Sequence, residues 1–340
     1  MKLSIHGGSV KSGIGIISKS IKTNSVTFLA ENNKVTLFGK DEIGGGEVLI
    51  PCDVRDVKDP KPFALPIDLA ESVFKSGGWY QLNVGDTMDF SSGSFTGSSI
   101  RILEPLETSL SPTTKSKMVG LTSLRKLMKR VNLESFLSVD QSIMHINTFK
   151  NKSYIICGDN IHAAICEIDG TQPISFPASY SKTIDLLDAD NVFASNNFFH
   201  IIGKEGKAYL PMMEVSMSFS NMASFLLNKS NHAWQGMIRA DDFKKKMPPM
   251  KIIKSGDAIR LAGNNKSFTV STSSDYGNLS DASEINGGSG KCEISLDPKS
   301  LNDIVSRLED NVSIRLYENK AIFSTTDDER IDYFVAKMVV

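Results

Sequence analysis

A threefold internal repeat is the feature of this 340-residue sequence that most constrains its fold. Segments 65–103, 176–213 and 296–338 each open with a large apolar residue, followed one or two positions later by a proline that suits the first turn of a helix. A stretch with helical apolar spacing comes next, and then short alternating runs separated by Gly, Asn or Asp. The starts lie 111 and 120 residues apart, a spacing typical of domains and not of solenoid units.

Another helix is expected earlier in each repeat, over residues 9–23, 121–131 and 237–251. Strand-like runs lie between the two helices of every repeat. The sequence therefore predicts an α+β chain in which helix, strands, helix and strands recur three times. We expect the three domains to span residues 1–108, 114–213 and 214–340.

Charge is distributed unevenly over these helices. The chain holds 38 Lys and Arg against 39 Asp and Glu, yet LTSLRKLMKRV (121–131) places its apolar residues on one helical face and four cations on the other. One such helix is usually a solvated surface, but all three first helices are rich in cations, which favours a surface that faces phosphates. The cations expected on this surface are Lys11, Lys19, Lys22, Arg125, Lys126, Lys129, Arg130, Arg239, Lys244, Lys245 and Lys246.

The order and spacing of these segments resemble the sliding clamps of the bacterial DNA polymerase III beta-subunit type, along essentially the full chain. The start MKLSIHGGSVKSGIGIIS is similar to the first strand and helix of that family. LPIDLAESVF, FPASYSKTIDLL and LDPKSLNDIVSRL are similar to the second helix of each clamp domain. SFTVSTSSDYGNLSDASEI and the tail IRLYENKAIFSTTDDERIDYFVAKMVV also resemble clamp segments.

The resemblance implies three DNA-clamp domains, each with two helices and two small antiparallel sheets, and two chains that close into a ring. In such a ring, the helices line the hole and duplex DNA passes through it. The chain would then be a cytoplasmic, homodimeric processivity factor that tethers a replicative DNA polymerase and has a clamp loader as a further partner. Its phosphate contacts would be independent of base sequence. Which polymerase or loader it serves is left open.

The resemblance also implies a site for partner peptides between the second and third domains. The family landmark there reads Thr-Asp-Gly, one residue, then Arg-Leu-Ala. Residues 158–164 align with it, but only Asp159 and Ala164 agree, and His162 stands in place of Arg and Ala163 in place of Leu. The family's Met-Pro-Met-Arg-Leu ending is replaced by residues 336–340. These departures are typical of a divergent clamp, of cellular or viral origin. The expected partner-site residues are Gly158, Ile161, His162, Ala163, Val335, Ala336, Met338 and Val340.

Two other classes of protein were weighed. An enzyme is disfavoured because the histidines and cysteines show no metal-binding spacing and the glycine-rich stretches lack a phosphate-loop context, so we expect no catalytic residue, metal or cofactor. No apolar run reaches the ~20 residues that span a membrane, so no membrane partner is expected. A structural or receptor-binding repeat protein without DNA in its hole remains the alternative. The repeated basic helices are the feature that argues against it.

Overall fold

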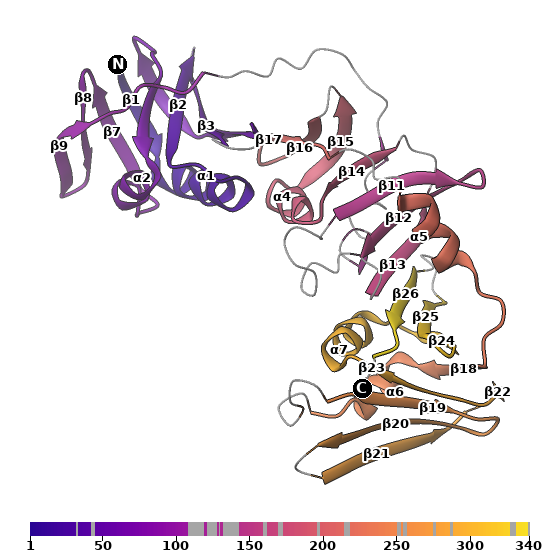
Figure 1. The fold of residues 1–340 in the computed structure, drawn as a ribbon. Coiled ribbons are helices and arrows are strands. Elements are labelled where there is room, and N and C mark those ends of the chain that lie inside the picture. The colour runs from indigo at the N-terminus through magenta and orange to yellow at the C-terminus, as the bar shows by residue number, and fades with distance from the viewer. Residues whose placement is uncertain are drawn as a thin grey trace. The chain divides into compact units, whose positions relative to one another are not determined.

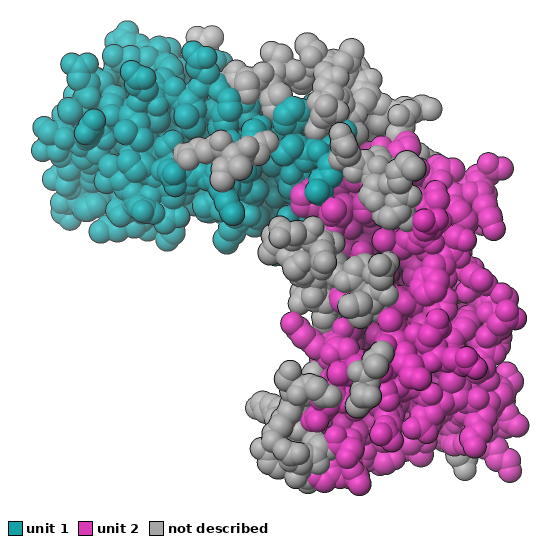
Figure 2. Space-filling view, in the orientation of Figure 1, with its two compact units in different colours: residues 1–125, 179–213 teal, residues 126–178, 214–340 magenta. Residues whose placement is uncertain are grey.

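The computed structural model of this chain describes residues 1–31, 33–41, 45–107, 119–120, 128, 130–131, 143–158, 162–168, 173–195, 198–213, 218–249, 253, 257–274, 277–285, 288–326 and 331–338. They form two compact units, coloured teal and magenta in Figure 2. Unit 1 takes residues 1–125 and 179–213, and unit 2 takes residues 126–178 and 214–340.

Unit 1 contains two antiparallel sheets, with strand orders β5-β1-β7-β8-β9 and β10-β15-β16-β17-β4-β3-β2-β6 (Figure 1). The first sheet is built from β1 (Lys2–His6), β5 (Val54–Lys58), β7 (Trp79–Val84), β8 (Thr87–Ser92) and β9 (Phe95–Arg101). The second is built from β2 (Ser25–Glu31), β3 (Lys34–Lys40), β4 (Glu47–Cys52), β6 (Phe63–Pro66), β10 (Val119–Gly120), β15 (Ala189–Ser195), β16 (Phe198–Gly203) and β17 (Lys207–Pro211). Its helices are α1 (Gly7–Ser20), α2 (Ile67–Val73) and α4 (Tyr180–Leu186).

Unit 2 also contains two antiparallel sheets, with strand orders β14-β11-β12-β13-β26-β25-β24-β18-β22 and β21-β20-β19-β23. The larger sheet is built from β11 (Ile143–Phe149), β12 (Lys152–Gly158), β13 (His162–Ile168), β14 (Ile174–Pro177), β18 (Trp234–Arg239), β22 (Ser289–Gly290), β24 (Asn311–Leu316), β25 (Lys320–Thr325) and β26 (Ile331–Ala336). The smaller is built from β19 (Ile259–Gly263), β20 (Ser267–Ser274), β21 (Gly277–Glu284) and β23 (Cys292–Leu296). Its helices are α5 (Ser218–Leu227), α6 (Ala240–Lys246) and α7 (Pro298–Arg307).

The strand order repeats three times along the chain. In each repeat, three strands form a first meander, and a later strand pairs with the first strand of that meander. The meanders are β2-β3-β4, β11-β12-β13 and β19-β20-β21, and the later strands are β6, β14 and β23. A helix follows, and then three strands form a second meander, whose first strand pairs with an earlier strand of the chain. The second meanders are β7-β8-β9, β15-β16-β17 and β24-β25-β26, and the earlier strands are β1, β10 and β18. The repeat expected from the sequence is thus present in the strand order, and the mixed α+β fold class is confirmed.

Sheets run without a break across two of the expected domain boundaries. In unit 1, β17 pairs with β4, and in unit 2, β26 pairs with β13. Each of these two joints, which we call seams, links the last strand of one repeat's second meander to the last strand of another repeat's first meander. Because the seams bind neighbouring repeats together, the chain divides by compactness into two units, and the three domain spans expected from the sequence stay a prediction.

The second helix of each repeat lies where the proline-opened segments predict it, as α2, α4 and α7. In α7 the expected apolar residues Leu301, Ile304 and Val305 are buried, and the side chain of Asp297 accepts a hydrogen bond from the Ser300 amide as an N-cap. The helix expected over 237–251 is shorter, because residues up to Arg239 continue β18 and α6 ends at Lys246. Apolar residues at alternate positions before Arg239 are better explained by a strand.

Helix α1 is longer than its glycines suggest. A methyl group at Gly13 would come within 2.7 Å of Leu37 Cδ1 and 3.1 Å of Ile50 Cγ2, so the missing side chain lets the helix approach the strands β3 and β4 closely. Val10, Ile14 and Ile17 are fully buried along the same helix. Burial of this apolar face therefore offsets the low helix propensity of glycine.

Candidate nucleic-acid interface and partner site

The cations of the first helix in unit 1 are exposed. Lys11 and Lys19 lie on α1, and Lys22 follows its C-terminal end. Among the described residues, none of the three forms an ion pair with an acid. Lys19 is in the last turn, where a positive charge is stabilised by the helix dipole. This part of unit 1 therefore presents uncompensated positive charge to solvent.

The basic helix expected over 121–131 is described at only a few positions. Met128 and Val131 are buried, as their place on the apolar face predicts, whereas Arg125, Lys126 and Lys129 lie outside the described residues. Arg130 is only 8% exposed, and its carbonyl accepts a hydrogen bond of 3.1 Å from the Tyr333 hydroxyl. The expectation that Arg130 is an exposed cation is therefore wrong. It borders the apolar arc, and the long stem of an arginine packs readily along such a surface.

The third group of cations is partly neutralised. Arg239, Lys244 and Lys245 are exposed, but Lys245 Nζ lies 3.7 Å from the carboxylate of Asp242. The Lys246 side chain is 11% exposed and pairs with Asp281 on β21 at 2.5 Å. Lys246 is thus engaged within unit 2, and the positive charge of α6 is smaller than the helix sequence alone indicates.

The two segments of the expected partner site meet in the large sheet of unit 2. His162 pairs with Val335 across β13 and β26, and Gly158 pairs with Ala163 across β12 and β13. Ala163 and Val335 are fully buried, so they form core and not an open pocket floor. Ala336 and Met338 keep part of their surface exposed. The remaining two expected residues, Ile161 and Val340, lie outside the described residues.

Helix α5 covers this part of the sheet. Its residues Phe219, Ala223 and Leu226 pack in one buried cluster with residues from both sides of the seam between β13 and β26, and Ala336 packs against that cluster. The other members of the cluster are Tyr154, Ile156, Ala163, Ile165, Tyr317, Ile322 and Phe334. The sequence analysis missed α5, although its apolar residues at positions 219, 223 and 226 have the spacing of a helix face.

A buried lysine holds the C-terminal end of α5. Lys320 is 6% exposed, and its Nζ donates a hydrogen bond of 3.2 Å to the Phe225 carbonyl. The same Nζ lies 4.0 Å from the centre of the Phe225 ring and 4.8 Å from that of Tyr317. Burial lowers the pKa of the Lys320 amine below its usual value. The contact satisfies one of the carbonyls that a helix end leaves without an intrahelical partner.

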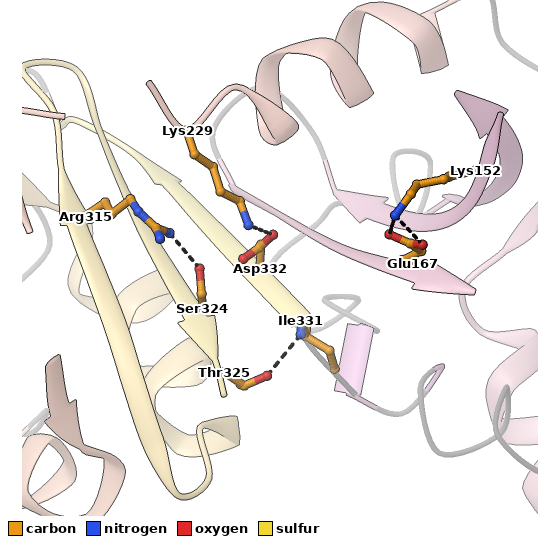
Figure 3. Close-up of polar contacts among 8 residues, drawn as sticks. All are labelled: Lys152, Glu167, Lys229, Arg315, Ser324, Thr325, Ile331 and Asp332. Atoms are coloured by element: carbon orange, nitrogen blue, oxygen red, sulfur yellow. Dashed lines mark hydrogen bonds and ion pairs between the residues drawn. The ribbon is translucent and has the colours of Figure 1, made fainter. Parts of the chain in front are cut away.

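A row of polar contacts lies in the same unit (Figure 3). Lys229, just beyond α5, pairs with Asp332 on β26 at 2.5 Å, and Lys152 pairs with Glu167 across β12 and β13 at 2.8 Å. The Lys229 and Asp332 side chains are largely buried, whereas the Lys152 pair is exposed and contributes little to stability. The Lys229–Asp332 pair gives α5 a second attachment to the sheet.

Two of the groups that could perform chemistry, His145 and Cys52, are engaged or protonated. His145 is buried, its Nδ1 lies 2.9 Å from Ser175 Oγ, and burial lowers its pKa. Burial also raises the pKa of the Cys52 thiol to about 12, which leaves it protonated and a poor nucleophile at neutral pH. Among the described residues, no three His, Cys, Asp or Glu side chains group as metal ligands, and no helix is long and apolar enough to cross a membrane.

Solved structures of high similarity are DNA polymerase III beta subunits. A putative beta subunit from Eubacterium rectale matches with a TM-score of 0.83 and 12% identity, covering 99% of each chain. The beta subunit of Thermotoga maritima matches with a TM-score of 0.80 and 14% identity, over 100% of this chain and 99% of that one. The sliding clamp of Pseudomonas aeruginosa, solved with griselimycin bound, matches with a TM-score of 0.83 and 13% identity over both full chains.

Sequence comparison alone does not detect this likeness. No family model and no curated protein matches the chain. The strand order, the helix positions and the full-length structural match nevertheless agree with the resemblance seen in the sequence. The chain has the fold of the DNA polymerase III beta sliding clamps.

Proposed function

We propose that the chain is a sliding clamp, a processivity factor whose two copies close into a ring around duplex DNA and tether a replicative DNA polymerase. The observation that carries this proposal is that two edge strands, equivalent to the strands that pair in the seams, have no partner strand on their outer side among the described residues. Each seam joins the last strand of a second meander to the last strand of a first meander. The two strands of this kind outside both seams are β9 and β21, and each is an edge of its sheet.

The register of the two seams predicts the register of a third. Val48 pairs with Ala208 in one seam, and Ala164 pairs with Tyr333 in the other. The hairpin turns of the repeats give the equivalent positions. On the last strands of the second meanders, Ala208 and Tyr333 correspond to Gly97. On the last strands of the first meanders, Val48 and Ala164 correspond to Leu279. In a ring, Leu279 of one copy would therefore lie opposite Gly97 of the other.

These two residues fit such a joint. Leu279 is 43% exposed, which is unusual for a large apolar side chain on a strand. Gly97 has no side chain, and the buried ring of Phe90 fills the space that a methyl group there would take, so Leu279 would lie against that ring. Edge strands that stay open promote unwanted association, so pairing β9 with β21 of a second copy also removes two open edges from each chain.

Particle size tests ring closure. The ring should run at about 74 kDa, twice the 37.2 kDa of one chain. Leu279→Lys should give monomers, because it places a charge in the proposed joint. Met237→Lys is the matched control, since Met237 is also exposed but lies on β18 between two paired strands, and it should leave the dimer intact. A folded wild-type chain that stays monomeric would contradict ring closure.

Cross-linking tests the register. Thr96 precedes Gly97 and Ser280 follows Leu279. Because the strands of the joint would be antiparallel, these two residues should also lie opposite each other. In the Thr96→Cys, Ser280→Cys double variant, a short thiol cross-linker should link two chains, while either single variant should not be linked in this way. Efficient linking by one single variant would contradict the proposed pairing.

The proposed DNA surface consists of the exposed cations on the first helices and directly beside their ends. Lys11, Lys19 and Lys22 in unit 1 and Arg239, Lys244 and Lys245 in unit 2 carry it, and Arg125, Lys126 and Lys129 remain candidates. Because these side chains are proposed to contact phosphates only, binding should weaken with salt and show no base preference. Circular duplex should be retained at salt concentrations that release linear duplex. Equal release of both would favour the structural-repeat alternative.

The proposed partner site lies beside α5, where Phe225, Ala336 and Met338 expose apolar surface. Apolar anchors of a polymerase or clamp-loader segment would bind there. Removing residues 338–340 should abolish polymerase binding while the ring and its DNA binding persist. Undiminished polymerase binding would place the partner site elsewhere. The proposal includes no reaction and no cofactor, and it places the ring in the cytoplasm with the replication machinery.

A further inference from the structure

A second candidate binding site lies in unit 1, at the N-terminal end of α1. A hollow of about 440 Å³ is lined by His6, Asp53, Val54, Arg55 and Trp79. It forms where the ends of three neighbouring strands meet, because β1 is flanked by β5 on one side and by β7 on the other. Its volume lies within the range of ordinary ligand sites, roughly 300–1,000 Å³.

The centre of the hollow is a stacked pair of planar groups. The Arg55 guanidinium carbon lies 4.0 Å from the centre of the Trp79 ring, and His6 meets the same ring edge-on at 5.4 Å between centroids. Arg55 is exposed, whereas Trp79 is half-buried, and the guanidinium lies over its ring. An arginine fixed in this way presents a planar cationic surface on which another flat group can stack.

The polar groups around this pair have no partner of their own among the described residues. No hydrogen bond or ion pair there involves the side chains of His6, Asp53 or Arg55. Arg55 and His6 can donate to phosphate oxygens, and the Asp53 carboxylate can accept from an N–H group of a base. A ligand that combines a flat base with an anionic backbone satisfies all three groups.

We infer that this hollow binds a base of single-stranded DNA, stacked on the Arg55–Trp79 pair. The choice of DNA over other flat anions rests on the proposed clamp function, because a replication clamp works next to single-stranded template. Stacking does not read sequence, so the site would hold a passing strand without stopping a sliding ring.

Trp79 supplies a direct signal for the test. The chain has two tryptophans, and Trp234 is 1% exposed, so a ligand in the hollow affects the fluorescence of Trp79 in particular. Titration of the full-length protein with a short oligothymidylate should quench this fluorescence to saturation. The absence of quenching in the wild-type protein would overturn the inference.

Four variants separate stacking from charge. Arg55→Ala, Arg55→Lys and Trp79→Leu should each weaken binding of a labelled oligothymidylate about tenfold, because each removes the planar stack. Lys58→Ala is the matched control: Lys58 is an exposed cation on the same strand outside the hollow, and its loss should change affinity about twofold or less. The inference would be overturned if Arg55→Lys bound the oligothymidylate as tightly as the wild type does. It would also be overturned if Lys58→Ala and Arg55→Ala lost the same amount of affinity for it.

The same proteins separate this inference from the proposed function. Particle size and retention of circular duplex report on the clamp, and all four variants should match the wild type in both. A wild-type chain that neither dimerises nor retains circular duplex would contradict the clamp, yet a saturable oligothymidylate signal lost in Arg55→Lys would still support the hollow as a single-strand site.

Discussion

Helices α1 and α6 open the first and third repeats, yet they present their charge differently. The lysines of α1 are exposed and form no ion pair with a described residue, whereas α6 has Asp242 beside Lys245 and holds Lys246 against Asp281. Equivalent helices of the repeat therefore present different amounts of unpaired positive charge. If the first helices face DNA, most of the attraction described here comes from α1, and α6 contributes less than its sequence suggests.

The largest effect should follow from neutralising α1. Changing Lys11, Lys19 and Lys22 together to Ser should flatten the slope of log K against log salt for duplex binding. Each lost phosphate contact lowers the slope by about 0.9, and since only some of the cations of a two-chain ring contact phosphate at once, we expect a change of roughly two to three units. Folding should be unaffected, because all three side chains are exposed. An unchanged slope would mean that α1 does not face the duplex.

The matching change in α6 should have a smaller effect. Lys244→Ser with Lys245→Ser should lower the same slope by about one unit, because Asp242 already compensates part of the charge of Lys245. The two variants are best measured side by side in one salt series. A larger change for α6 than for α1 would reverse the proposed ranking of the two helices.

Removing the carboxylate of Asp242 should make the charge of α6 more like that of α1. Asp242→Asn should steepen the slope by up to about one unit, because it frees Lys245 to release counterions on binding. Asp241→Asn is the control, since Asp241 is exposed on the same turn and forms no ion pair among the described residues. The prediction fails if the two substitutions steepen the slope equally, because the effect would then be one of net charge alone.

The smallest effect concerns stability. Lys246→Met should leave the salt slope of duplex binding unchanged and lower the free energy of unfolding by about 0.5–1 kcal/mol, because the exposed Asp281 carboxylate keeps much of its hydration when its partner is lost. Urea unfolding followed by circular dichroism measures this change. A clear loss of DNA affinity would show that Lys246 contributes to the interface despite its ion pair.

The repeat was predictable because it depends on local signals. Prolines at the starts of three helices and alternating strands between turns are visible in the sequence, and α2, α4 and α7 lie where those signals place them. The family resemblance implied that the segments around His162 and Val335 belong to one partner site. The two residues pair across β13 and β26, and the site itself stays a prediction.

The errors came from partners distant in sequence. Lys246 looked like a free cation because its partner Asp281 is on β21, and Arg130 looked exposed because its helix was considered without the sheet it packs on. Helix α5 was missed although its own residues carry a helical pattern. Lys320 could not have been found in this way, because a lone lysine at a strand end gives no sign that it will be buried against the end of a helix.

The two seams differ in extent, and this difference has a mechanical consequence. The seam of unit 1 pairs three residues of β17 with β4, while the seam of unit 2 pairs five residues of β13 with β26 and is covered by α5. Local opening requires breaking the hydrogen bonds of a seam together with the packing over it. Amide protons of β17 and β4 should therefore exchange with solvent faster than those of β13 and β26. Of the two seams, the one between the first two repeats should therefore yield first when the chain is strained.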